Sequence, residues 1–281
     1  MIDFHTHILP LEIINNLEKY TEKDTTLKSL FQKPNSKFST AEFLCEKMNE
    51  HQINQSVVLG MGWSDSGLNS FVNDYILDSA KNSLGKLIPF TGINPTDVKS
   101  GINEAIRCIE SGSKGFGEIH CDFQNFNITD KNIMAPYMEI LEDYKLPIVI
   151  HASEPVGHMY PGKGLTTPNK LVKTIEDFPN NNFVLSHWGG GLFFYELMPE
   201  IARSLKKVYY DCSASPFLYD NKIYEVALKI LDSTKILFGS DFPLIDPSRI
   251  TDDIEKLSID QKALDDIYWK NAFNILNLSN E

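Results

Sequence analysis

The sequence predicts one α/β domain, a closed (β/α)₈ TIM barrel that spans residues 1–281. Three observations support this fold class. Eight short apolar segments recur along the chain, amphipathic helical patterns alternate with most of them, and metal-competent side chains stand where several segments end. Strands that are apolar on both faces and alternate with helices are typical of parallel sheets. Eight such units in about 280 residues fit a barrel.

Each apolar segment has the length and composition of a buried strand. An open, doubly wound sheet is the alternative architecture. It fits less well because such a sheet gathers its site at one switch point, whereas the candidate site residues here lie on at least five strands. The eight expected strands cover residues 1–7, 55–61, 87–94, 113–120, 146–152, 182–187, 207–213 and 235–241.

Apolar residues spaced three and four apart predict the helices between these strands. Ser39-Thr40-Ala41-Glu42 resembles a capping box, in which side chains satisfy the free N–H groups of the first helical turn. Gly85 and Gly112 are stop signals behind two of the patterns. The clearest helices are expected at residues 39–50, 68–80, 102–109 and 264–278.

The net charge of the chain is −12, from 26 Lys and Arg against 38 Asp and Glu. Binding to a phosphate backbone requires a basic face, so no nucleic-acid partner is expected. The chain has no apolar run of about 18 residues, so no membrane span is expected. Four cysteines without a C-x-x-C pair, and no leader sequence, predict a cytoplasmic protein with free thiols. A small-molecule substrate is the expected partner, and the sequence leaves open whether the protein forms a homo-oligomer.

The chain opens with a His-x-His motif at the end of an apolar run, Met1-Ile2-Asp3-Phe4-His5-Thr6-His7. Residues i and i+2 of a strand point to the same face, so His5 and His7 are expected to project side by side. Two imidazoles held in this way can bind one divalent metal ion. Asp3 alternates with them and is a candidate for a hydrogen bond to a ligand histidine.

Further metal-competent side chains stand at the ends of the fourth, fifth, sixth and eighth expected strands. They are Glu118, His151, His187 and Asp241. The carboxyl ends of all barrel strands meet at one mouth. We therefore expect these four residues to surround one cavity together with His5 and His7.

Several motifs resemble the amidohydrolase-2 branch of the amidohydrolase superfamily of metal-dependent barrels. They are Phe4-His5-Thr6-His7, Ser186-His187-Trp188-Gly189-Gly190, Gly239-Ser240-Asp241-Phe242-Pro243 and Asn271-Ala272-Phe273-Asn274-Ile275-Leu276, the last being similar to the closing helix of that branch. The resemblance spans nearly the whole chain. It implies a metal-dependent enzyme, because the branch contains hydrolases and non-oxidative decarboxylases.

Glu118 leaves the number of metal ions open. Gly117-Glu118-Ile119 is similar to the TatD-type metal nucleases, in which a strand-four glutamate bridges two ions. Decarboxylases of the branch usually hold one ion and need no bridge. Glu118 is therefore expected to bridge two ions, to serve as a hydrogen-bonding carboxylate in the pocket, or to form an ion pair in the barrel. The chain is expected to bind one or two ions.

The expected ligand chemistry suits Zn²⁺ first and Mn²⁺ second, since His5, His7, His151 and Asp241 offer three nitrogens and one oxygen. The resemblance implies that Asp241 ligates the ion and also moves a proton between water and leaving group. A turn residue is the alternative role. His187 is expected either to ligate a second ion or to act on water or substrate from a hydrogen-bonding position. Packing against Trp188 is its alternative.

Four residues that follow strands are candidates for substrate contact: Trp63, His120, His158 and Trp188. Plain packing is the alternative for the two tryptophans, and a loop or surface position for the two histidines. Lys163 and Arg249 are further candidates for binding a substrate carboxylate, again with the surface as the alternative. The polar segment 8–38 is expected to be a long loop over the mouth, either solvated or acting as a lid.

Together these features predict a metal-dependent hydrolase that cleaves a small ester, lactone or amide with metal-activated water. The first alternative is a metal-dependent non-oxidative decarboxylase, in which no water attacks. A TatD-like nuclease is disfavoured by the net charge of −12. A barrel that binds metal without turnover is disfavoured by the complete ligand set.

Overall fold

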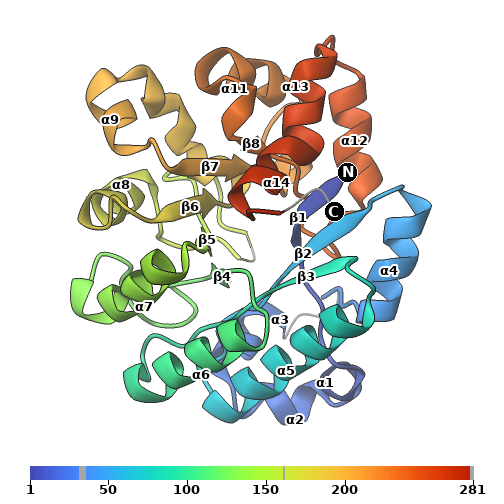
Figure 1. The fold of residues 1–281 in the computed structure, drawn as a ribbon, viewed down its shortest axis with the longest axis vertical. Helices are drawn as coiled ribbons and strands as arrows, with labels where there is room; N and C mark the ends of the chain where they lie inside the picture. Colours follow the sequence, from blue (N-terminus) through green and yellow to red (C-terminus); the bar gives the residue numbers. More distant parts are fainter. Residues whose placement is uncertain (32–35, 161, 279–281) are drawn as a thin grey trace.

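Eight strands form a ring at the centre of the molecule, and helices surround it on the outside (Figure 1). The computed structural model describes residues 1–31, 36–160 and 162–278. All eight expected strands are present, and each pairs in parallel with the next one within its sheet. The expected α/β barrel is therefore confirmed.

The strands are shorter than expected and mostly end before the site residues. His120 and His151 follow directly after a strand, and Asp241 lies several residues beyond one. The strands are β1 (Ile2–Thr6), β2 (Gln55–Leu59), β3 (Leu87–Phe90), β4 (Phe116–Ile119), β5 (Pro147–Ile150), β6 (Asn182–Leu185), β7 (Val208–Asp211) and β8 (Ile236–Leu237).

Two isolated bridges close the ring. Strands β1–β3 form one sheet and β4–β8 form another. Thr91 pairs with Phe116 between β3 and β4, and Thr6 pairs with Phe242 just after β8. The backbone N–H of Phe4 also donates to the carbonyl of Phe238 at 2.8 Å. The first strand therefore lies beside the last, as closure of a barrel requires.

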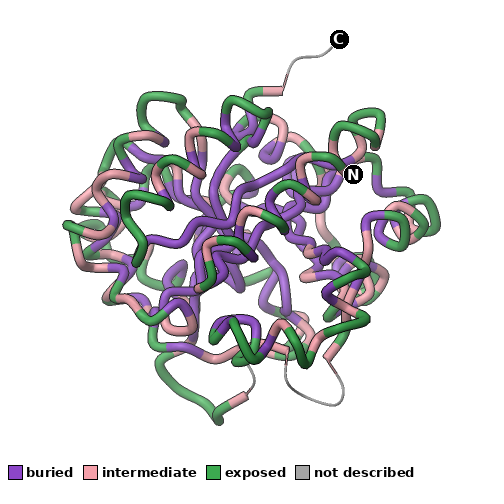
Figure 2. Tube along the Cα trace, turned by 90° about the horizontal axis from the view of Figure 1, so that it is seen from below, coloured by how far each residue is buried: buried purple, intermediate pink, exposed green. Residues whose placement is uncertain are grey.

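Apolar side chains fill the interior of the ring, where Figure 2 shows the buried residues gathered at the centre. The buried members of this cluster come from six strands and the last helix, and Phe4 and Phe90 meet edge to face with their ring centroids 5.9 Å apart. Ala272 and Ile275 of the last helix belong to the same cluster. The last helix therefore plugs the end of the barrel opposite the mouth.

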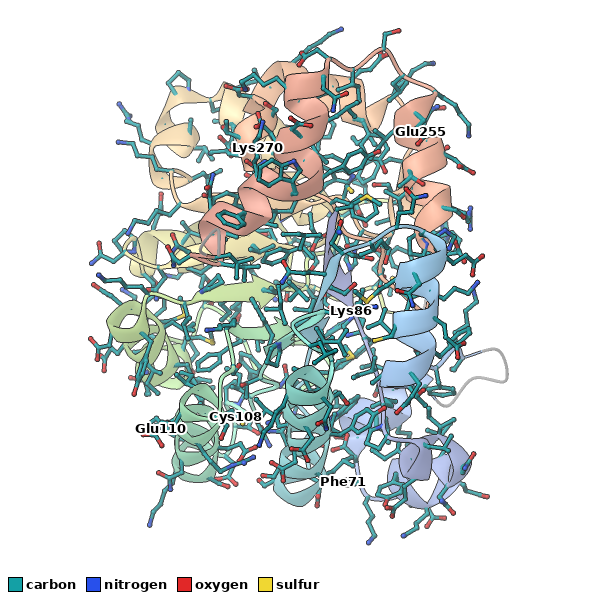
Figure 3. The ribbon with its side chains drawn as sticks, turned by 45° about the vertical axis from the view of Figure 1, so that its right-hand side comes forward. Phe71, Lys86, Cys108, Glu110, Glu255 and Lys270 are labelled. Carbon is teal, nitrogen blue, oxygen red and sulfur yellow. The ribbon has the colours of Figure 1, made fainter. Side chains whose placement is uncertain are left out.

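The four expected helices are confirmed as α4, α5, α6 and the closing run α13–η3–α14. Polar side chains of the helices around the barrel, such as Glu110 of α6 and Glu255 of α12, lie on the outer surface (Figure 3). The helices and helical turns are α1 (Leu11–Asn15), α2 (Leu17–Thr21), α3 (Thr25–Phe31), α4 (Ala41–Glu50), α5 (Ser66–Asn82), α6 (Val98–Glu110), α7 (Lys131–Tyr144), α8 (Pro168–Asp177), η1 (His187–Leu197), α9 (Pro199–Ser204), α10 (Ser215–Leu218), α11 (Ile223–Leu231), η2 (Ser233–Lys235), α12 (Pro247–Glu255), α13 (Gln261–Asp265), η3 (Asp266–Lys270) and α14 (Asn271–Ile275).

The segment after β1 differs from the expected loop. Its described residues form three short helices, α1 to α3, and residues 32–35 lie outside the described part. Ile13 and Leu27 are fully buried in an apolar cluster that they share with residues of α4, β2 and α5, so this segment packs against those elements. Its α3 end is tied to loops at the mouth, since Thr26 Oγ1 donates to the carbonyl of Phe123 at 3.1 Å. The expectation of a solvated loop was wrong, because apolar side chains of the segment are buried in this cluster. Its role as a lid stays a prediction.

Within the described residues, no helix combines the length and apolar character needed to cross a bilayer.

We predict that Asn271→Ala lowers the free energy of unfolding by about 1–3 kcal/mol, because it leaves two buried carbonyls with fewer partners. The Asn271 amide donates to Ser233 O at 2.7 Å and to Ile236 O at 2.8 Å, and the side chain is buried. Urea denaturation measures the change. Asn274→Ala is the matched control, since Asn274 is exposed on the same helix. Equal stability of the two variants would contradict this role.

Candidate active site

The structure brings all six expected ligands together at the mouth of the barrel. They form two groups, each with ligand atoms within 4.8 Å of one another: His5, His7 and Asp241, and Glu118, His151 and His187. All six side chains are largely buried. The strand-end positions inferred from the sequence therefore do converge on one site.

In both histidines of the first group, an oxygen acceptor holds the ring proton on Nδ1. Nδ1 of His5 lies 2.9 Å from Oδ2 of Asp211, and Nδ1 of His7 lies 3.2 Å from the carbonyl of Leu59. Each acceptor requires a proton on Nδ1, which leaves Nε2 with its lone pair. The two Nε2 atoms then face each other 3.1 Å apart.

This arrangement fits a divalent cation. Two lone pairs at 3.1 Å repel each other unless a proton or a cation lies close to both. Oδ1 of Asp241 lies 3.8 Å from His5 Nε2 and 3.7 Å from His7 Nε2, so an anionic oxygen completes the group. Imidazole and carboxylate together suit Zn²⁺, Mn²⁺ and other first-row ions.

Glu118 stands between the two groups. Its Oε2 lies 3.6 Å from His5 Nε2 and 3.8 Å from His7 Nε2. Its Oε1 lies 3.1 Å from His151 Nδ1 and 3.6 Å from His187 Nε2. Each oxygen of one carboxylate therefore faces a different set of histidines.

The charges of this cluster are strongly coupled. Burial alone raises the pKa of the Glu118 carboxyl, but neighbouring His5 and His151 hold it well below its usual value. Burial lowers the pKa of His5, yet the carboxylates of Asp211 and Glu118 bring it well above its usual value. In the absence of an ion, a proton on His5 thus supplies the positive charge that the site requires.

Asp241 differs from the other carboxylates of the site. Burial raises the pKa of its carboxyl to about 7. Its backbone N–H donates to the carbonyl of His5 at 2.9 Å, which ties the segment after β8 to β1. The residue adopts a left-handed conformation with φ 68°, which is uncommon outside glycine and is typical of functional positions.

Irregular strand pairing aims two of the ligands. The register shifts between Asp3 and Thr6 of β1, so Phe4 joins the apolar interior while His5 faces the site. A second shift lies in β4 beside Glu118, where Gly117 has φ 121°. A Cβ at Gly117 would lie 2.4 Å from the Val149 carbonyl oxygen, so only glycine fits. Such bulges re-aim side chains next to active sites.

The turn after β6 is equally constrained. His187 and Trp188 both adopt positive φ, 57° and 60°. Gly190 follows with φ 59°, and a Cβ there would lie 2.4 Å from the carbonyl oxygen of Ser153. Close approach of these two backbones places His187 beside the loop that carries His151, and their rings meet edge to face with centroids 4.9 Å apart.

Sequence reasoning missed two residues at the end of β7, Asp211 within the strand and Ser213 just after it. Asp211 is completely buried and contacts the ring of His5, and Ser213 Oγ lies 2.8 Å from Nδ1 of His187. The available signal was the Tyr209-Tyr210-Asp211-Cys212-Ser213 segment, an apolar strand ending in polar side chains like the strands that carry ligands.

The expected role of Asp3 needs correction. It accepts hydrogen bonds from the backbone N–H of His5 at 3.2 Å and from Ser240 N and Oγ at 2.9 and 2.6 Å. No hydrogen bond joins Asp3 to a histidine ring among the described residues. Asp3 therefore fixes the backbone that precedes Asp241, because the register shift in β1 takes it out of line with His5.

Of the four candidates for substrate contact, His120 lies nearest the ligands. Its ring stacks on His151 at 4.0 Å between centroids and on Phe123 at 4.1 Å. Nε2 of His120 lies 2.9 Å from the carbonyl of Gly162, and burial lowers its pKa to about 3. The ring of His120 supports the ring of the candidate ligand His151, and contact of His120 with substrate stays a prediction.

The remaining candidates lie apart from the ligand groups. Trp63 is 1% exposed in the cluster beneath α1–α3, and Trp188 is 0% exposed with Nε1 donating to Ser215 Oγ at 2.7 Å. Packing, the alternative for both, is what these positions favour. His158 is exposed on the loop after β5. Nζ of Lys163 is bound to carbonyls of that loop.

A family model described as amidohydrolase, the amidohydrolase-2 model, matches residues 2–278. The chain belongs to the amidohydrolase-2 family. The resemblance inferred from the motifs is thereby confirmed, while the TatD-like role of Glu118 stays a prediction. Among curated proteins, no sequence match to this amidohydrolase-2 protein reaches significance.

Solved structures share the fold of this amidohydrolase-2 protein over its whole length. A 5-carboxyvanillate decarboxylase from Sphingomonas paucimobilis is 13% identical with a TM-score of 0.80, and 99% of each chain is covered. A 5-carboxyvanillate decarboxylase from Novosphingobium aromaticivorans, complexed with manganese and 4-hydroxy-3-methoxy-5-nitrobenzoic acid, is 15% identical with a TM-score of 0.79, covering 99% of this chain and 96% of that one.

A third structure is a dihydroxybenzoic acid decarboxylase from a Polaromonas species with bound manganese and the inhibitor 2-nitroresorcinol. It is 16% identical with a TM-score of 0.76, and the match covers 100% of this chain and 97% of the other. At these identities the similarity establishes the barrel fold.

Proposed function

We propose that this amidohydrolase-2 protein is a metal-dependent, non-oxidative decarboxylase of a small aromatic carboxylic acid. The observation that carries the proposal is whole-length similarity to decarboxylases whose structures hold manganese and an aromatic ligand. Mn²⁺ moves ahead of Zn²⁺ as the proposed ion on the same ground. Hydrolysis, which the sequence favoured first, becomes the second candidate.

The ligand chemistry of the mouth supports this proposal. His5, His7, His151 and Asp241 are the residues that would hold one ion, and their nitrogen and oxygen donors suit Mn²⁺. A bound divalent ion would hold the oxygen atoms of the substrate and withdraw electrons from the bond that breaks.

Asp241 is the residue best suited to move the proton. Decarboxylation breaks the bond between the ring carbon and the carboxylate, carbon dioxide leaves, and the ring carbon takes up a proton. A carboxyl whose pKa is raised to about 7 by burial can deliver a proton near neutral pH and recover it from water. Its Oδ1 lies 3.7 Å from His7 Nε2, at the centre of the ligand cluster.

We predict that the Mn²⁺-loaded protein releases carbon dioxide from one or more hydroxylated benzoic acids, and that Asp241→Asn lowers kcat at least about 100-fold. The amide keeps the shape of the side chain but cannot carry the proton. Asp252→Asn, on the exposed face of α12, is the matched control. Release of carbon dioxide from labelled substrates measures both. Hydrolysis of an ester or lactone in which ¹⁸O from water enters the acid product, without carbon dioxide release, would contradict decarboxylation.

Hydrolysis at a two-metal site is the second candidate, and one observation favours it. The two oxygens of Glu118 face separate histidine pairs, His5 with His7 and His151 with His187. A carboxylate in this position can bridge two ions roughly 3.5–4 Å apart, which is the spacing of two-metal hydrolases. His187 would then be a ligand rather than a hydrogen-bonding group.

Metal counting separates the two candidates. If Glu118 bridges two ions, Glu118→Gln should reduce the occupancy from two ions per chain toward one, because the amide offers only one ligand oxygen. If the protein is the proposed decarboxylase, the wild type should hold one ion and Glu118→Gln should leave that number unchanged. Elemental analysis after dialysis against Mn²⁺ measures the number of ions bound per chain. Glu104→Gln is the control, since Glu104 pairs with Arg107 on α6.

A further inference from the structure

Asp211 contacts two histidines of the candidate metal site, His5 and His187, from a single buried position. Its Oδ2 lies 2.9 Å from Nδ1 of His5. Its Oδ1 accepts from the backbone N–H of His187 at 3.1 Å, from Ser213 N at 3.0 Å and from the Ser213 hydroxyl. The carboxylate is 0% exposed, so these hydrogen bonds take the place of contacts with solvent.

The Ser213 hydroxyl extends this contact to the ring of His187. Because its proton goes to Asp211, Ser213 Oγ can only accept from Nδ1 of His187, which lies 2.8 Å away. A chain of hydrogen bonds therefore runs from His187 through Ser213 to Asp211, and a second bond joins His5 to the same carboxylate.

We infer that Asp211 is the positioning residue that fixes the tautomers of His5 and His187, so that His5 presents an unprotonated Nε2 to a divalent ion and His187 directs an unprotonated Nε2 toward Glu118. This inference deepens the proposed function and rests on its metal site, although not on the reaction catalysed there. In both rings the proton stays on Nδ1, and both Nε2 atoms face Glu118, at 3.6 Å. Asp211 thereby connects His5 of β1 with His187, which follows β6, through hydrogen bonds to both residues.

The two oxygens of Asp211 are not equivalent, which makes an amide substitution informative. Oδ1 faces two backbone N–H groups, so an amide must place its oxygen there and its NH₂ where Oδ2 was. That NH₂ would donate to Nδ1 of His5. The proton of His5 would then move to Nε2, the atom that a metal ion needs.

The test is a Co²⁺ titration that follows the visible ligand-field bands of the bound ion. Asp211→Asn should weaken Co²⁺ binding by about 10–100-fold and alter the bands, since one imidazole is lost. Ser213→Ala should weaken binding by several-fold, because the hydroxyl that donates to Oδ1 of Asp211 is lost and the carboxylate that holds the His5 ring is less firmly fixed.

Asp266→Asn is the matched control. Asp266 is a buried carboxylate held by Ser233 Oγ and Lys262 Nζ at 2.6 and 2.8 Å on η3, and its substitution should leave Co²⁺ binding unchanged. Wild-type affinity and bands in both Asp211→Asn and Ser213→Ala would overturn the inference, and Ser213→Ala alone decides it if Asp211→Asn does not fold. Absence of Co²⁺ binding by the wild type would instead overturn the proposed metal site.

Discussion

The arrangement of the mouth depends on one electrostatic constraint. Several buried nitrogen lone pairs and carboxylates lie close together and need a shared positive charge. His5 Nε2 and His7 Nε2 face each other at 3.1 Å, and the carboxylate of Glu118 lies close to both. Unpaired buried charges and opposed lone pairs are costly in a low dielectric. A divalent cation resolves both problems at once, and a proton on His5 is its substitute in the metal-free protein.

The fold meets this constraint by local departures from regular structure. Register shifts in β1 and β4 turn His5 and Glu118 toward the mouth. Left-handed backbone at His187 and Asp241 does the same after β6 and β8. Closure of the ring between β1 and the segment after β8 then brings His5 and Asp241 together from opposite ends of the chain. These distortions persist because the packed barrel and its plug, α14, hold the surrounding backbone.

Much of this arrangement could be predicted from the sequence, because strand ends in a parallel barrel converge on one mouth. The convergence of the six candidate ligands was predicted in this way, each as a polar residue at the end of an apolar run. The rest depended on geometry that alternation cannot reveal. Asp3 was expected to bond a ligand histidine, and it does so only through the backbone N–H of His5, because the bulge after it was not visible in the sequence. Asp211 was overlooked because it acts by orienting His5 and His187, and contacts between distant strands cannot be read from one strand's sequence. Cytoplasmic location and oligomeric state stay predictions.

The central claim is that the Nε2 atoms of His5 and His7, together with Asp241, form a divalent metal site. Anomalous diffraction from crystals grown with Mn²⁺ tests it most directly, because it locates the ion and identifies the element. We expect a strong anomalous peak bonded to both Nε2 atoms and to an oxygen of Asp241. Crystals with saturating Mn²⁺ and no peak between these three side chains, or with a peak only at surface carboxylates, would contradict it.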